Sequence, residues 1–166
     1  ITCGGTDSNK ISLKILKAIA SIKNIAKVKV IIGPNFSENY IHEITNFIDQ
    51  NSLIVKKIIS PKSIQKYICW SDSTIATSGL TKYELIKEGV PSIIIPFDQK
   101  QFLLNKSSQN KNAFLTLSPD RICLELESVL VSLMEDYSKR KKISQAALDL
   151  IDGKGVSRII SRINKK

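Results

Sequence analysis

The sequence predicts an α/β fold in which helices cover both faces of a parallel sheet. Three observations lead to this prediction. Short apolar runs alternate along the chain with amphipathic segments of helical period. The run Ile93–Ile95 contains no polar residue, as expected for a strand that is buried on both faces. Glycine turns follow several of the apolar runs, at the points where a strand would lead into the next helix.

We expect six strands and their connecting helices to form a single domain over residues 1–166. The expected strands cover residues 1–3, 27–33, 53–59, 73–76, 91–95 and 113–117. The expected helices cover residues 11–22, 37–48, 61–70, 81–88 and 101–108, and most of the chain from 118 onward. Gly89 ends the helix 81–88. Parallel sheets bind ligands beyond the carboxyl ends of their strands, so the turns there are the candidate site.

The chain has a formal net charge of +10, from 25 Lys and Arg against 15 Asp and Glu. This charge suits an anionic partner, which could be nucleic acid, a membrane surface or a small ligand. No nucleic-acid-binding motif accompanies it, so we expect no nucleic acid partner. The dense basic run is Lys139, Arg140, Lys141 and Lys142. We interpret it as a solvated helix face; the alternative is a peripheral contact with an anionic membrane or a protein partner.

Cys3, Cys69 and Cys123 are too widely spaced for a zinc pattern or a disulfide framework. We interpret all three as buried thiols of a cytoplasmic protein. No segment has the ~18 apolar residues that span a membrane, and the chain shows no signal peptide. Because the chain begins with Ile1 and not Met, we expect a fragment or an isolated domain of a longer protein.

The turn Ser78-Gly79-Leu80-Thr81 lies between a predicted strand and a predicted helix. Its hydroxyls, together with the free N–H groups at a helix N-terminus, suit a diphosphate. Glu84, one helical turn further on, could accept hydrogen bonds from ribose hydroxyls. The alternative is that Ser78 caps the helix and that Glu84 is a first-turn acid favoured by the helix dipole.

A second glycine turn, Gly4-Gly5-Thr6, follows the first predicted strand. Its glycines would let the backbone approach a phosphate, and the helix after it offers its N-terminus. The alternative is an ordinary turn in which Asp7, Ser8 or Asn9 caps that helix. The turn lacks the third glycine of a dinucleotide fingerprint and the Lys of a P-loop, so neither of those sites is predicted.

Asp98–Gln101 is predicted to be a polar loop, either facing the same edge of the sheet as the glycine turns or simply solvated. His42, which is the chain's one histidine, falls on the flank of a predicted helix, and no motif places a nucleophile beside it. We therefore expect no general base, no catalytic residue and no metal or cofactor site in this chain.

Three segments in their order along the chain resemble a known family: GGTD, then SGLTKYELIKEGVPSIIIPFDQKQ, then IDGKGVSRI. Together they resemble the C-terminal domain of GT-B nucleotide-sugar enzymes, one Rossmann-like half of that two-domain fold. The tail motif favours the SpsG/PseG type, which covers spore-coat polysaccharide proteins and the UDP-sugar hydrolase of pseudaminic acid synthesis. The middle motif is shared more widely, with MurG-type glycosyltransferases.

The resemblance implies that this domain holds UDP or a UDP-sugar. The implied contacts are Gly5 and Thr6 beside the diphosphate, Ser78, Gly79, Leu80 and Thr81 holding it, Glu84 on the ribose, Ser60 and Pro61 at the uracil, and Gln101 toward the sugar. The chain departs from the family pattern in having Lys100 where Asn is usual, and Leu80 in place of a small residue.

In the hydrolase subgroup the catalytic histidine belongs to the N-terminal domain. The resemblance therefore implies that this chain binds the nucleotide weakly and turns nothing over alone. Three alternatives stay open at this point. The first is a MurG-like glycosyltransferase domain with a UDP-sugar donor. The second is a non-enzymatic basic module that binds through Lys139–Lys142, and the third is a nucleotide-binding fold without function.

Overall fold

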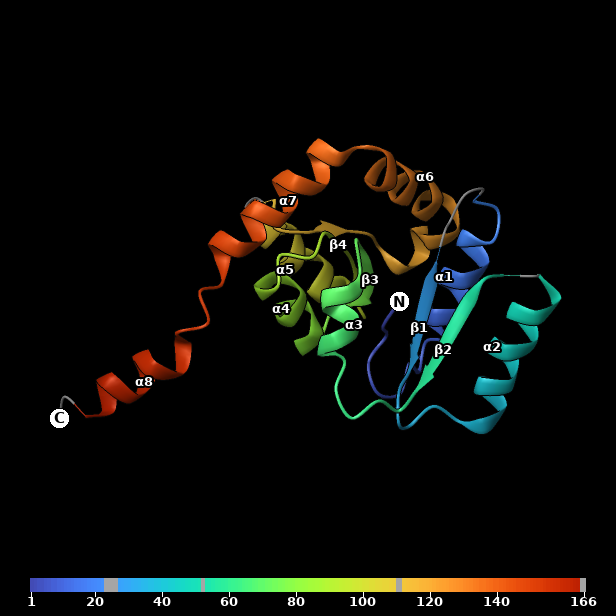
Figure 1. Ribbon diagram of the computed structural model, residues 1–166, viewed down its shortest axis with the longest axis horizontal. Helices are drawn as coiled ribbons and strands as arrows, with labels where there is room; N and C mark the ends of the chain where they lie inside the picture. The colour runs from blue at the N-terminus through green and yellow to red at the C-terminus, as the bar shows by residue number, and fades with distance from the viewer. Residues whose placement is uncertain (23–26, 52, 110–111, 165–166) are drawn as a thin grey trace.

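A computed structural model describes residues 1–22, 27–51, 53–109 and 112–164. Its strands are β1 (Val28–Ile32), β2 (Val55–Ile59), β3 (Thr74–Thr77), β4 (Ser92–Ile95) and β5 (Leu115–Thr116). Its α-helices are α1 (Ile11–Ile19), α2 (Glu38–Gln50), α3 (Gln65–Trp70), α4 (Leu80–Lys87), α5 (Gln99–Gln109), α6 (Ile122–Glu135), α7 (Tyr137–Leu150) and α8 (Gly155–Ile163). Figure 1 shows the strands at the centre, enclosed by α1 to α7.

The sheet is parallel and reverses its strand order at the start of the chain. β1 pairs with β2, while β3 pairs with β4 and β4 with β5. Thr2 joins the two groups, because it forms parallel bridges to both Ile31 and Ala76. The order across the sheet is therefore β2, β1, Thr2, β3, β4, β5. The expected first strand is reduced to this single bridged residue, yet it occupies the centre of the sheet.

Apolar clusters on both faces of the sheet confirm the predicted architecture. Ile93 and Ile95 pack with α1, α2 and α6 in one cluster. Ile94, which points the other way, packs with α3 and α4 in the second cluster. Successive side chains of a strand alternate between the faces, so an entirely apolar strand requires cover on both sides. Gly89 has φ +66°, which confirms the predicted end of α4.

Several boundaries differ by a few residues from those predicted, most clearly at α3 and β5. The helix expected from Pro61 begins at Gln65, whose N–H is accepted by Ser63 Oγ at 3.2 Å. The strand expected over 113–117 shortens to β5, which pairs with β4 through Leu115 and Thr116 alone.

The expected burial of all three cysteines was correct only for Cys3. Burial raises the pKa of the Cys3 thiol to about 12, so this side chain behaves as a small apolar residue. Cys69 and Cys123 are exposed.

Part of the basic run has a structural role within the chain. Lys139 Nζ donates to Ser132 Oγ at 2.9 Å, and the Arg140 guanidinium donates to the carbonyl oxygens of Leu133, at 2.8 Å, and Met134. These carbonyls end α6, where a cation is favoured by the helix dipole. The run therefore anchors α7 on α6 through two of its members, and Lys141 and Lys142 remain exposed.

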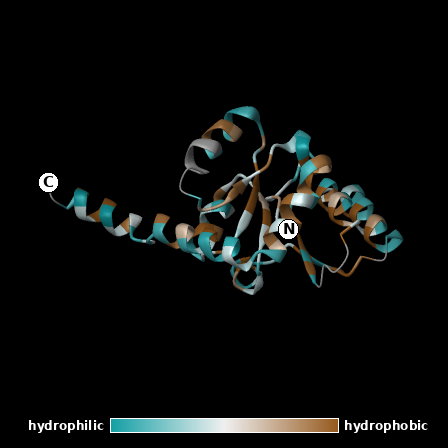
Figure 2. Cartoon of the chain, turned by 90° about the horizontal axis from the view of Figure 1, so that it is seen from above, coloured by the Kyte–Doolittle hydropathy of each residue, from teal (hydrophilic) through white to brown (hydrophobic). Residues whose placement is uncertain are grey.

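Helix α8 extends away from the rest of the chain, as Figures 1 and 2 show. Its apolar side chains recur at helical spacing on one face and are 52% to 71% exposed, so no described part of the chain covers them. They are Val156, Ile159, Ile160 and Ile163. No helix among the described residues is both long enough and apolar enough to cross a membrane.

Candidate functional site

The candidate site lies at the carboxyl edge of the sheet, where the strand order reverses. Thr2 N donates to the Ile75 carbonyl at 3.0 Å, and Thr77 N donates to the Thr2 carbonyl at 3.2 Å. The turns that follow these two neighbouring strands, Gly4–Thr6 and Ser78–Thr81, therefore lie side by side. This reversal point is where open α/β sheets bind their ligands.

The Gly4–Gly5 turn rests directly on a third turn, after β1. Asn35 N donates to the Gly5 carbonyl at 2.9 Å. A Cβ atom on Gly33 would lie 2.4 Å from the Gly4 carbonyl oxygen and 2.5 Å from that of Gly5. Such a contact is shorter than atoms allow, so residue 33 must be glycine for the first turn to hold its place.

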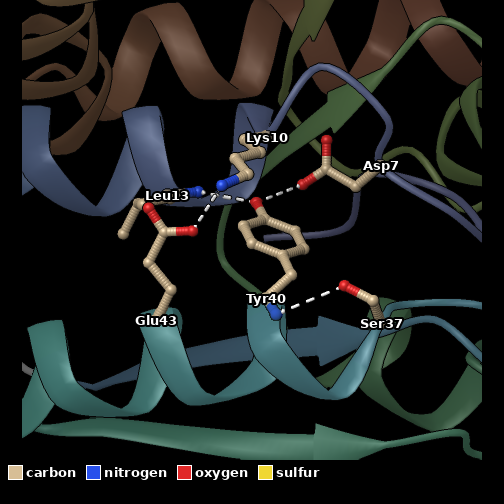
Figure 3. A network of polar contacts seen from close by, with 6 residues as sticks. All are labelled: Asp7, Lys10, Leu13, Ser37, Tyr40 and Glu43. Atoms are coloured by element: carbon tan, nitrogen blue, oxygen red, sulfur yellow. Dashed lines mark hydrogen bonds and ion pairs between the residues drawn. The ribbon is translucent and has the colours of Figure 1, made fainter.

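The N-terminus of α1 is occupied by an internal anion, the carboxylate of Asp7 (Figure 3). Asp7 is buried, and its oxygens accept the N–H groups of Ile11 and Ser12, each at 2.8 Å. The Tyr40 hydroxyl, from α2, donates to the same carboxylate at 2.8 Å. Burial and this hydrogen bond raise the pKa of Tyr40, so it stays a donor. The expectation that the N-terminus of α1 receives a phosphate is thus wrong for these two amides.

The N-terminus of α4, by contrast, is open. Gly79 is its N-cap, and no side chain within the described ranges caps it. Ser78 was one alternative cap, but its Oγ accepts a hydrogen bond from Asn105 Nδ2 of α5 at 3.1 Å. Leu80 is 84% exposed, and Glu84 is exposed one turn further along. The uncapped N–H groups beside the Gly4–Thr6 turn can therefore accept an anion from solvent.

Ser60 and Pro61 follow β2, the edge strand on the far side of β1. Ser60 N donates to the Ile32 carbonyl at 2.9 Å, and Ser60 has φ +42°. Figure 1 shows this segment running from the end of β2 to α3. Ser60 and Pro61 thus share the carboxyl edge with both glycine turns, but β1 and the Thr2 strand lie between their strand and β3, which leads to Ser78.

The expected loop Asp98–Gln101 is instead the start of α5. Asp98 Oδ1 accepts the Gln101 N–H at 2.7 Å, and Gln101 Oε1 accepts the Phe97 N–H at 3.2 Å. The spacing of an acid and a glutamine three residues apart is a capping pattern that the sequence displayed. Gln101 was the predicted sugar contact. Its side-chain carbonyl oxygen is therefore occupied at the start of α5, and its NH₂ group remains able to bind a ligand.

The site also includes two side chains that the sequence analysis did not indicate. Asn105 lies in α5 and is 2% exposed, and Lys82 lies in the first turn of α4. Lys82 Nζ donates to Asn105 Oδ1 at 2.9 Å. Neither residue stands in a motif, and only the hydrogen bonds of Asn105, which join α5 to the start of α4, bring them beside Ser78.

Groups that could carry other chemistry lie elsewhere. His42 is exposed on α2, as expected. Among the described residues, no three His, Cys, Asp or Glu side chains are grouped to hold a metal ion. A cavity of about 580 Å³, bordered by Tyr67 and Trp70, opens at the amino ends of the strands near Val28 and Thr74, on the opposite edge of the sheet.

Comparison with known proteins places this geometry in context. No family model matches the chain. The spore coat polysaccharide biosynthesis protein SpsG of Bacillus subtilis (strain 168) is 22% identical over 164 residues, which are 96% of this chain and 47% of SpsG. MurG of Acinetobacter baumannii superposes with a TM-score of 0.73 at 12% identity, over 99% of this chain and 52% of MurG.

A third protein was solved with a ligand. HepE of Anabaena, in complex with UDP-glucose, gives a TM-score of 0.70 at 17% identity, over 90% of this chain and 43% of HepE. The chain has the Rossmann-like fold of one half of a GT-B protein. This GT-B half spans about half the length of SpsG, MurG and HepE.

Proposed function

We propose that this GT-B half binds UDP or a UDP-sugar for an enzyme of surface-polysaccharide synthesis. The observation that carries the proposal is the uncapped N-terminus of α4, set beside the Gly4–Thr6 turn where the strand order reverses. That arrangement suits a diphosphate, because backbone N–H groups and the helix dipole stabilise its charge. The likeness to SpsG and the UDP-glucose bound to HepE support the class of ligand.

The proposed contacts follow the order of the turns along the edge. Ser78 to Thr81 hold the diphosphate, with Gly5 and Thr6 on its other side. Glu84 accepts the ribose hydroxyls, and the segment at Ser60 and Pro61 meets the uracil. Gln101 reaches the sugar through its NH₂ group, since its Oε1 accepts the Phe97 N–H.

We further propose that the reaction requires a second, N-terminal domain, which supplies the catalytic base. The described residues offer no histidine at the carboxyl edge of the sheet, and the relatives are about twice as long as this chain.

Two reactions fit the proposal. In a hydrolase, water would release the sugar from the nucleotide. In a glycosyltransferase, an acceptor molecule would take the sugar. The basic module is less favoured, because Lys139 and Arg140 bond within the chain. We also propose that the protein is cytoplasmic, and that Lys141 and Lys142 are the members of the basic run free to contact an anionic membrane.

The proposal predicts that UDP binds the chain and that Glu84→Ala weakens this binding by roughly tenfold to a hundredfold. A carboxylate that accepts two ribose hydroxyls makes charge-assisted hydrogen bonds, whose loss costs this much. Calorimetric titration of UDP, GDP and NADH measures the effect, with Thr81→Ala as a second site variant. Lys141→Ala is the matched control and should bind as the parent chain does. The proposal is wrong if none of the three ligands gives heat.

The chain alone is expected to release no sugar from a UDP-sugar, because the catalytic base is proposed to lie in the other domain. Incubating the chain with UDP-N-acetylglucosamine and following free sugar by NMR tests this. Release above the rate in buffer, abolished by Glu84→Ala, would show that the chain carries its own catalytic groups.

A further inference from the structure

Asn105 is a buried amide at the centre of the candidate site. Its Nδ2 donates to Ser78 Oγ at 3.1 Å, and its Oδ1 accepts from Lys82 Nζ at 2.9 Å. The Lys82 ammonium also lies 5.6 Å from the centre of the Phe114 ring. The Asn105 side chain thus binds two groups at once: the Ser78 hydroxyl, which precedes the N-cap of α4, and the Lys82 ammonium, which follows it.

The amide leaves both held groups able to bind an anion. Ser78 Oγ accepts from Nδ2 at 3.1 Å, and its own proton reaches Oδ1 only across 3.4 Å, so a bound anion can take this proton in place of a long hydrogen bond. Because Oδ1 is neutral, the ammonium of Lys82 keeps its full positive charge. A carboxylate of the same shape would do the opposite. Its charge would hold the Ser78 proton in a stronger hydrogen bond and would neutralise Lys82.

We propose that Asn105 is a positioning residue for the diphosphate. It aims the Ser78 hydroxyl as a donor and holds Lys82 through a neutral oxygen, so that the ammonium keeps its charge beside the open N-terminus of α4. Lys82 is then a further diphosphate contact, in addition to the residues of the turn. This inference rests on the proposed function, since it names the groups of that same site that neutralise the ligand's charge.

The test is Asn105→Asp, which keeps the size of the side chain and changes only its charge and donor. Dissociation constants for UDP and for uridine, which lacks the diphosphate, are measured by ligand-observed NMR. We expect UDP affinity to fall about tenfold or more, as for the loss of one charge-assisted contact, and uridine affinity to change less than about twofold. A merely structural role for Asn105 would weaken both ligands alike, and that result would overturn the inference.

Lys82→Met keeps the test decisive should Asn105→Asp fail to fold, because Lys82 is only half-buried. It should lose UDP affinity selectively as well, whereas Lys87→Met removes the same charge from an exposed position of α4 and should leave both affinities unchanged. If Lys82→Met binds UDP as the parent chain does, the inference fails and the proposed function stands. If the parent chain binds neither UDP nor uridine, both fail.

Discussion

Replacing Asp7 with alanine is expected to lower the free energy of unfolding by about 3 kcal/mol. The change removes the acceptor of two N–H groups of α1 and of the Tyr40 hydroxyl, all at 2.8 Å. These donors sit where water cannot replace the carboxylate, because Asp7 is buried. At about 2–4 °C for each kcal/mol, the melting temperature should fall by about 6–12 °C. Urea denaturation followed by circular dichroism measures the effect.

Two variants separate the contributions to this effect. Asp98→Ala removes another acid at a helix start, but an exposed one, and should cost about 1 kcal/mol or less. Tyr40→Phe deletes the donor to Asp7 and the acceptor of the Leu13 N–H, and should cost about 2 kcal/mol. In the double variant of Asp7 and Tyr40 the two effects should not add, because the residues share one hydrogen bond. An Asp7→Ala protein as stable as the parent would contradict the internal-anion role of this carboxylate.

The alternation of apolar runs and turns was enough to predict the sheet, its two covered faces and the location of the candidate site. Such patterns are local, and Ile93–Ile95 shows how strongly they constrain burial. The central position of Thr2 could not be predicted in the same way. It depends on bridges to Ile31 and Ala76, which lie far away along the chain.

The choice among possible caps also depended on distant residues. Asp7, Ser8 and Asn9 are about equally good caps by type, and Asp7 is selected because Tyr40, 33 residues away, donates to it. Asn105 had no local signal either, since its partners come from α4. The position of Gln101 could have been predicted, because its spacing from Asp98 matches a helix-capping pattern.

Gly33→Ala is expected to cost about 3 kcal/mol and to abolish detectable UDP binding. The new Cβ would meet the backbone of Gly4 and Gly5 at 2.4 to 2.7 Å, so the first glycine turn would have to move. Overpacking against backbone costs this much, because no flexible side chain can give way. The displaced turn would carry Gly5 and Thr6 away from the open N-terminus of α4. Chemical denaturation and UDP calorimetry on the same variant measure both effects.

Gly5→Ala is the variant that separates folding from binding. A Cβ there would find its nearest atom, Asn35 Nδ2, at 3.9 Å, which is an ordinary contact. Its free energy of unfolding should therefore stay within about 0.5 kcal/mol of the parent value. If a diphosphate lies against this turn, the added methyl group meets the ligand and UDP affinity falls at unchanged stability. Stable Gly5→Ala with full UDP affinity would place the diphosphate away from the first turn, and would leave the start of α4 to hold it.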